Sequence, residues 1–200
     1  MLALVTLFAI GWQLALHVGA SYSALNFFSY FTNLSNLFAA FVLLSSVFLG
    51  DHGSRDLLRY LSAANMTIVG LVFAVLLRNA DLGALRPWVN VVLHYVTPSA
   101  IVLDWLVAPP AHRLSLRRAF MTLVFPAVYL AYILVRGAGT GWYPYPFLNP
   151  SDAGGYGAVL AYSIGIAGTF LLVSWTLLVV GNRLGGLRSM QHAFERTRRE

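Results

Sequence analysis

Two side chains of this 200-residue sequence, Thr32 and His94, have the types needed for nucleophilic chemistry. An imidazole can take the proton of a hydroxyl group, which makes the oxygen a nucleophile toward a carbonyl carbon. The sequence contains no cysteine and no lysine, which excludes thiol and amine nucleophiles, disulfides and thiolate metal sites. It also lacks a G-x-S-x-G elbow, an H-E-x-x-H helix and a phosphate loop. The composition therefore favours a hydroxyl nucleophile with a histidine base.

A polar stripe surrounds Thr32. Ser29, Thr32, Asn33 and Asn36 follow an i, i+3, i+4, i+7 spacing in an otherwise apolar stretch, so in a helix they share one face. Polar side chains held in hydrocarbon need partners, which predicts that this face points into a bundle. The amides of Asn33 and Asn36 suit two roles: donating to a developing oxyanion, or joining helices through hydrogen bonds. Thr32 also suits the second role.

His94 has polar neighbours of its own. Asn90 lies one helical turn before it and is a third candidate oxyanion donor, whereas Pro98 lies one turn after it. Because Pro98 has no N–H, it cannot donate the helical hydrogen bond that the carbonyl of His94 would accept, which predicts a kink. An intramembrane histidine is rare and expensive, so a functional role for His94 is favoured. Asp104 lies about 15 Å further along the helix axis and suits an ion pair with an arginine as well as chemistry.

Membrane-spanning helices must position these side chains. The sequence is 58% hydrophobic and 10% charged, with a mean hydropathy of +0.71, which an ordinary soluble domain does not show. We predict an all-α integral membrane protein whose single domain, residues 1–182, is a six-transmembrane-helix bundle. The first stretch lacks the basic start of a signal peptide and is kept as a helix. The predicted spans lie near residues 1–18, 27–49, 59–79, 87–108, 116–136 and 156–181, and a basic tail follows at 183–200.

The arginines predict the orientation of the bundle, since all thirteen basic residues are arginine. If both termini lie on the side of the connections 50–58 and 109–115, ten arginines are on that side and only Arg78, Arg86 and Arg136 are on the other. The positive-inside rule then places both termini in the cytoplasm. The basic tail is expected to lie against anionic membrane lipids and not to bind nucleic acid.

This orientation predicts that Thr32 and His94 lie at similar depths. The second and fourth spans both enter from the outer side, and at 1.5 Å per residue Thr32 lies about 8 Å and His94 about 10 Å below their outer ends. The last outer connection, residues 136–157, is rich in proline and aromatic residues. This composition predicts either a folded loop over the bundle or an aromatic belt that anchors two helix ends. The aromatic residues expected to line or cap a pocket are Tyr30, Trp142, Tyr143 and Tyr145.

Three short pieces of the sequence carry a family resemblance: YFTNL around Thr32, NVVLHYVTP around His94, and GWYPYPFL in the last outer connection. The chain resembles a bacterial relative of the androgen-induced six-helix membrane hydrolases, and it is also similar to uncharacterised six-helix bacterial proteins that share the tyrosine-proline loop. The resemblance implies an intramembrane threonine hydrolase that acts on fatty acyl esters, such as fatty acid esters of hydroxy fatty acids. It puts Thr32 in the place of the nucleophile and His94 in the place of the histidine. We expect a multi-pass protein of the bacterial inner membrane with a lipid substrate and neither a cofactor nor a metal.

Two other function classes stay open. A haem protein would use His17 and His94, both in the outer half of the membrane, as axial ligands. A lipid or small-molecule binder or transporter would use the same polar cavity without chemistry, although the chain has no pair of broken helices in repeated halves. The sequence gives no oligomeric state.

Overall fold

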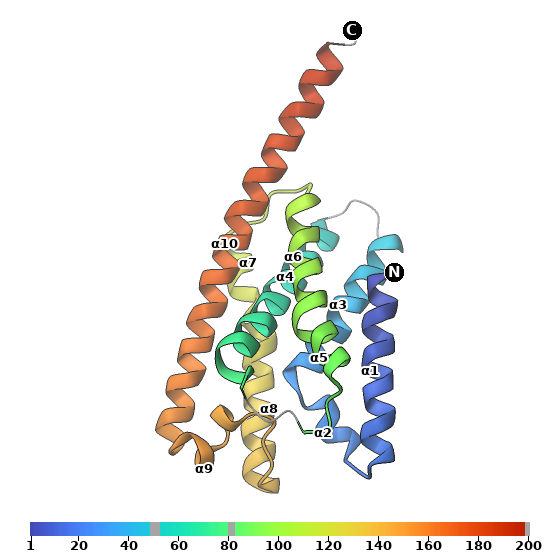
Figure 1. The fold of residues 1–200 in the computed structure, drawn as a ribbon. Coiled ribbons are helices and arrows are strands. Elements are labelled where there is room, and N and C mark those ends of the chain that lie inside the picture. Colours follow the sequence, from blue (N-terminus) through green and yellow to red (C-terminus); the bar gives the residue numbers. More distant parts are fainter. Residues whose placement is uncertain (49–52, 80–82, 199–200) are drawn as a thin grey trace.

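The computed structural model describes residues 1–48, 53–79 and 83–198, and every regular element in these ranges is helical. This confirms the predicted all-α class. The long helices run side by side as a bundle (Figure 1). In chain order the elements are α1 (Leu2–Gly19), α2 (Ala24–Phe28), α3 (Phe31–Phe48), α4 (Gly53–Val72), η1 (Phe73–Leu77), α5 (Pro87–Val91), η2 (Val92–Val96), α6 (Thr97–Val107), α7 (Arg117–Met121), α8 (Val124–Thr140), η3 (Pro146–Leu148), α9 (Pro150–Ala153) and α10 (Tyr156–Thr197).

Five helices are long and apolar enough to cross a membrane, which supports a multi-pass membrane protein. They match five of the six predicted spans. The predicted span 27–49 differs, because it divides into α2 and α3, and the apolar stretch found in α3 is shorter, Phe31–Ser46. In the described residues, length and apolar character support five spans, and the sixth predicted span is not confirmed. The five are Leu2–Gly19, Gly53–Leu77, Pro87–Val107, Arg117–Thr140 and Tyr156–Gln191.

Polar side chains stabilise the break between α2 and α3, where two residues separate the helices. The hydroxyl of Ser29 donates to the carbonyl of Leu25 at 2.7 Å, and the amide of Asn33 donates to the carbonyl of Phe27 at 2.8 Å. These bonds satisfy carbonyl groups at the end of α2 that have no partner within the helix. Thr32 is therefore the second residue of α3, whereas the sequence placed it inside one continuous helix.

Two wide helical turns lie at the level of the site. The segments η1 and η2 are π-helical, and they bring the ring of Phe73 onto the ring of His94 with centroids 4.1 Å apart. The irregularity predicted before Pro98 takes this form, since η2 occupies the turn whose normal hydrogen bond Pro98 cannot donate. Single π turns inside helices are frequent at functional sites.

The helix α4 packs against α3, α6 and α10 and forms the centre of the bundle. The hydroxyl of Tyr60 on α4 donates to the carbonyl of Ser174 at 2.8 Å, and the indole of Trp105 on α6 donates to the carbonyl of Leu177 at 2.9 Å. Both rings are fully buried against α10. These contacts hold the end of the bundle opposite the aromatic loop.

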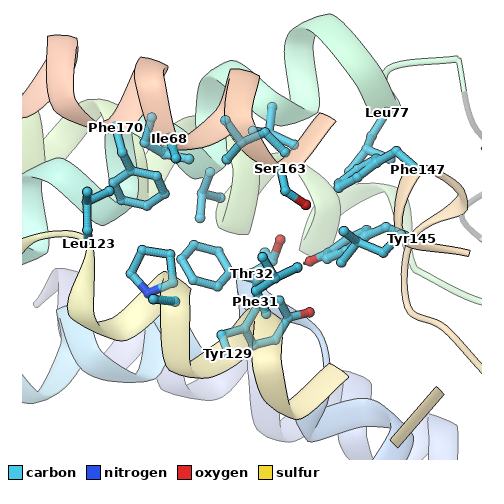
Figure 2. Close-up of a pocket in the computed structure, with 18 residues that line it drawn as sticks. Phe31, Thr32, Ile68, Leu77, Leu123, Tyr129, Tyr145, Phe147, Ser163 and Phe170 are labelled. Atoms are coloured by element: carbon cyan, nitrogen blue, oxygen red, sulfur yellow. Dashed lines mark hydrogen bonds between the residues drawn. The ribbon is translucent and has the colours of Figure 1, made fainter. Parts of the chain in front are cut away.

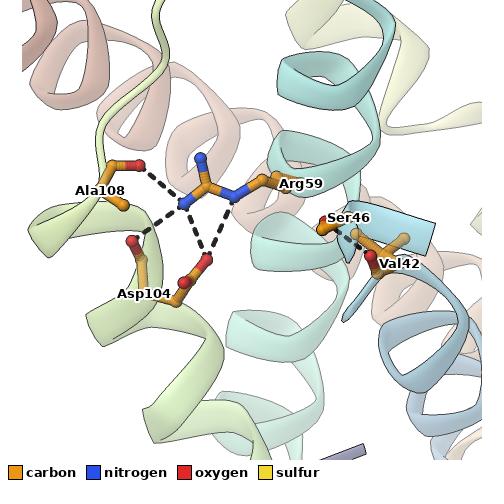
Figure 3. A network of polar contacts seen from close by, with 5 residues as sticks. All are labelled: Val42, Ser46, Arg59, Asp104 and Ala108. Atoms are coloured by element: carbon orange, nitrogen blue, oxygen red, sulfur yellow. Dashed lines mark hydrogen bonds and ion pairs between the residues drawn. The ribbon is translucent and has the colours of Figure 1, made fainter. Parts of the chain in front are cut away.

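Asp104 pairs with an arginine, which was one of its two expected roles. Arg59 donates to the carboxylate of Asp104 at 2.7 Å and also to the carbonyls of Asp104 and Ala108 (Figure 3). The guanidinium therefore joins α4 to the end of α6. Asp104 is part of the framework and lies apart from His94.

The last helix is longer than the predicted span. α10 continues as one helix through residue 182, where the sequence analysis ended the transmembrane domain, to Thr197. It contacts the bundle as far as Gly185, where an added Cβ would lie 2.5 Å from the carbonyl oxygen of Pro110. Beyond that point α10 extends away from the other helices (Figure 1). The basic tail is thus a continuation of the last helix.

Candidate functional site

The structure brings Thr32 and His94 into contact. The hydroxyl oxygen of Thr32, in the first turn of α3, lies 3.3 Å from Nε2 of His94 in η2. Nδ1 of His94 lies 3.2 Å from the carbonyl oxygen of Asn90. A carbonyl can only accept a hydrogen bond, so Nδ1 carries the proton and Nε2 presents its lone pair to the hydroxyl. Thr32 therefore donates to His94, which is the arrangement of a nucleophile with its base.

Packing and a bridging amide hold this pair in place. The imidazole of His94 is 8% exposed and lies against the ring of Phe73. The amide nitrogen of Asn36 donates to the carbonyl of Thr32 at 2.9 Å and to that of Leu93 at 3.2 Å. One buried amide thus connects the backbone of Thr32 with the residue next to His94.

The three asparagines hold the backbone in this arrangement. Asn33 donates to α2, and both amide protons of Asn36 point to carbonyls. Asn90 touches the site through its own carbonyl, while its side-chain oxygen is buried without a hydrogen-bond partner among the described residues. Of the two roles left open for Asn33 and Asn36, the geometry favours joining helices, because Asn36 donates two hydrogen bonds and Asn33 donates one to backbone carbonyls.

An apolar cavity of about 210 Å³ adjoins Thr32 (Figure 2). Thr32 lines it but His94 does not, so Thr32 lies between the base and the cavity. Polar atoms in the wall come from few residues, including Tyr129, Tyr145 and Ser163. The other lining residues are Phe31, Ile68, Val69, Val72, Leu77, Leu123, Pro126, Ala127, Leu130, Phe147, Leu148, Ile166, Ala167 and Phe170. Such a cavity fits hydrocarbon with a reactive polar group at one end.

The sequence analysis missed most of this wall. Residues of α8 and α10, such as Ala127 and Ala167, showed no signal, because a small residue in an apolar helix is as common at a packed interface as at a cavity. The polar stripe identified Thr32 only. The cavity exists because α4, α8 and α10 leave space between them at this level.

Tyr145 from the aromatic loop contacts Thr32 directly. The backbone N–H of Thr32 donates to the hydroxyl oxygen of Tyr145 at 3.3 Å. The Tyr145 ring is 8% exposed, is parallel to the ring of Phe147 and meets the ring of Tyr30 edge-on. Burial raises the pKa of the Tyr145 phenol to about 12, so the phenol is neutral at physiological pH. Tyr145 thus lines the cavity.

Trp142 and Tyr143 anchor the same loop, although neither lines the cavity. The guanidinium of Arg136 lies over the ring of Trp142 at 4.9 Å, and this ring also meets Tyr30 edge-on. Tyr143 packs on Gly137 of α8, where an added Cβ would lie 2.1 Å from the ring. The connection is therefore a folded loop over the bundle, the first of its two expected forms.

His17 lies apart from His94. Its Nε2 is 3.1 Å from the carbonyl oxygen of Ser23, and its ring contacts Tyr22 and Phe27. The Nε2 atom of His94 in turn lies 3.3 Å from the hydroxyl of Thr32, so in this arrangement each histidine directs Nε2 to a neighbour of its own and not to a shared haem iron. In the described part of the chain, no group of three or more His, Cys, Asp or Glu side chains is placed to hold a metal ion.

Comparison with known proteins gives one match. A family model described as FAR-17a/AIG1-like protein matches residues 26–180, which include both Thr32 and His94 and the aromatic loop. This is the androgen-induced family that the three short pieces resemble. No curated protein and no solved structure matches the chain.

Proposed function

This chain belongs to the FAR-17a/AIG1-like protein family, and from that premise we propose that it is an intramembrane lipid ester hydrolase with Thr32 as the nucleophile and His94 as the general base. One observation carries the proposal: the Thr32 hydroxyl contacts Nε2 of His94 at 3.3 Å and also lines an apolar cavity. The Nδ1 proton points to the carbonyl of Asn90, which leaves Nε2 free to accept.

The reaction proceeds in two halves. The Thr32 hydroxyl proton passes to Nε2 of His94 as the oxygen bonds to the ester carbonyl carbon, whose π electrons move to the carbonyl oxygen. Collapse of this intermediate releases the alcohol, which takes the proton from His94, and leaves an acyl-threonine. Water then gives a proton to His94 and attacks the acyl group, and Thr32 recovers its proton as the fatty acid leaves.

The cavity wall supports a fatty acyl substrate. The wall is almost entirely apolar, so an acyl chain is buried favourably there and its ester carbonyl lies next to Thr32. Fatty acid esters of hydroxy fatty acids are the substrates that we propose. They would enter from the outer leaflet of a bacterial inner membrane, with both chain termini in the cytoplasm as the arginine distribution predicts.

The test compares Thr32→Ala and His94→Ala with the unchanged protein, purified in detergent. Hydrolysis of a p-nitrophenyl fatty acid ester is measured together with labelling by a fluorescent fluorophosphonate, and the labelled residue is mapped. Loss of a general base costs about 10²–10⁴-fold in rate. We expect both variants to lose hydrolysis to that extent or more, and labelling to map to Thr32 and to require His94.

Two matched controls accompany these variants. Thr169→Ala removes a half-buried threonine of α10 whose hydroxyl donates to the carbonyl of Gly165. His17→Ala removes the histidine that contacts Ser23, Tyr22 and Phe27. Both should keep full activity. Ester hydrolysis that survives loss of Thr32 or His94 would refute the mechanism, and substrate binding without any product would indicate a binder or transporter. A Soret band that disappears in His17→Ala would indicate a haem protein.

A further inference from the structure

We propose that the phenolic O–H of Tyr145 donates a hydrogen bond to the oxyanion that forms when Thr32 attacks an ester, which makes Tyr145 a catalytic residue. This inference rests on the proposed function, because it assigns the group that stabilises the intermediate of that reaction. The sequence alone predicts Tyr145 only in the pocket wall and favours asparagines for the oxyanion role.

The position of Thr32 in the first turn of α3 brings the Tyr145 phenol next to it. The second residue of a helix has a backbone N–H without a partner inside the helix. In the structure this N–H donates to the hydroxyl oxygen of Tyr145 at 3.3 Å. The bond holds the phenol beside the nucleophile, and the positive end of the α3 dipole lies at the same place, which favours negative charge there.

The phenol of Tyr145 can accept one hydrogen bond and donate another at the same time. Accepting the N–H of Thr32 uses a lone pair of the oxygen and leaves the O–H proton to be donated. Because the ring is 8% exposed and burial keeps the phenol neutral, this proton is present at physiological pH. A donor that accepts one hydrogen bond while it donates another is also polarised in the favourable direction.

The placement of the cavity gives the direction of the oxyanion. His94 contacts the Thr32 hydroxyl but does not line the cavity, so the substrate carbonyl must approach Thr32 from the cavity side. Tyr145 lines that side, and its hydroxyl points toward Thr32 (Figure 2). The carbonyl oxygen of a bound ester and the phenol proton therefore meet in the same space.

Asn90 does not line the cavity, and the other candidate side chains donate hydrogen bonds elsewhere. Both amide protons of Asn36 point to backbone carbonyls, and the amide of Asn33 donates to the end of α2. Tyr129, which also lines the cavity, donates its hydroxyl to the carbonyl of Ser29 at 2.8 Å. The Tyr145 hydroxyl accepts from the N–H of Thr32, and the hydroxyl groups of Thr32 and Tyr129 lie beside it. Its own proton can therefore turn from these neighbouring hydroxyls to the stronger acceptor that an oxyanion provides.

The experiment is Tyr145→Phe, which keeps the ring and removes the donor. Removing one oxyanion donor costs about 10²–10³-fold in kcat, and we expect this loss with a KM within about threefold of the original, because the bond forms in the transition state. A trifluoromethyl ketone of a fatty acid, which forms a tetrahedral adduct with Thr32, should lose affinity by a similar factor. Tyr162→Phe, at an exposed tyrosine of α10 whose ring contacts Phe147, is the matched control and should keep both values.

The outcomes separate this inference from the proposed function. If Thr32→Ala keeps hydrolysis, the proposed function fails. If Thr32→Ala is inactive and Tyr145→Phe keeps its kcat, or changes only KM, the inference alone is overturned. Should Tyr145→Phe fail to fold, a fluorinated tyrosine introduced at position 145 keeps ring and hydroxyl but makes the proton a stronger donor. Unchanged kcat and unchanged ketone affinity in that protein would also overturn the inference.

Discussion

Gly137→Ala should disturb the loop that carries Tyr145, because Tyr143 packs directly on the backbone of α8. The added Cβ would lie 2.1, 2.3 and 2.6 Å from three atoms of the Tyr143 ring. Carbon atoms in contact are about 3.5–4.0 Å apart, so the ring must move away by about 1 Å or more. The ring is half-buried against the cluster that includes Tyr129, Ile133 and Tyr145, so this movement breaks its contacts there.

The magnitude follows from two opposing effects. Forcing extra volume into a packed interface costs about 1–3 kcal/mol, whereas replacing glycine by alanine within a helix contributes about 0.5–1 kcal/mol of stability. Gly139→Ala makes the same change on the same helix at a position with nothing within 4 Å of the new Cβ. We therefore expect Gly137→Ala to be less stable than Gly139→Ala by about 1–3 kcal/mol.

The assay is unfolding of both purified variants in mixed micelles by sodium dodecyl sulfate, followed by far-ultraviolet circular dichroism. Labelling of Thr32 by a fluorophosphonate provides a second readout, and it should be slower in Gly137→Ala because a displaced Tyr143 moves Tyr145, two residues away. Equal stability and equal labelling rates in the two variants would show that the loop is not packed on α8 as described.

Three further predictions concern the framework, the cavity and pH. Arg59→Met should lower the free energy of unfolding by about 1–3 kcal/mol, because it removes the donor to one carboxylate and two carbonyls. Asp104→Asn changes a side chain that is 45% exposed and should lower it by only about 0–1 kcal/mol. Equal losses for the two variants in detergent unfolding would contradict this difference. Ala167→Leu should shift hydrolysis toward shorter acyl chains because it fills the cavity, as measured with p-nitrophenyl esters of increasing length, and an unchanged preference would place the acyl chain elsewhere. Burial raises the pKa of Tyr145 from an ordinary 10.0 to about 12, so its contribution to the free energy of unfolding is complete below pH 10 and is lost as the pH rises toward 12. The free energy of unfolding of Tyr145→Phe should therefore depend less on pH between these values. Identical pH profiles for the two proteins would argue against a buried neutral phenol.

The amino-acid sequence was sufficient for the class of protein and for the central pair of residues. Long apolar runs indicate spanning helices because the cost of placing polar groups in hydrocarbon depends on composition alone. The same cost made Thr32 and His94 stand out, and a simple depth argument placed them at the same level. The structure puts the hydroxyl oxygen of Thr32 3.3 Å from Nε2 of His94. The family match over residues 26–180 agrees with the resemblance carried by the short pieces around them.

Other features depended on how the helices meet. The break before Phe31 arises from hydrogen bonds such as that of Asn33 to Phe27, and it moved Thr32 from the interior of a helix to its first turn. The roles of the asparagines depended on which carbonyls they reach. The cavity and the contact of Tyr145 with Thr32 join segments that are more than a hundred residues apart. Hydropathy and spacing describe one helix at a time, whereas the rotation of each helix and the fold of the last loop are set by packing between helices, which no local pattern encodes.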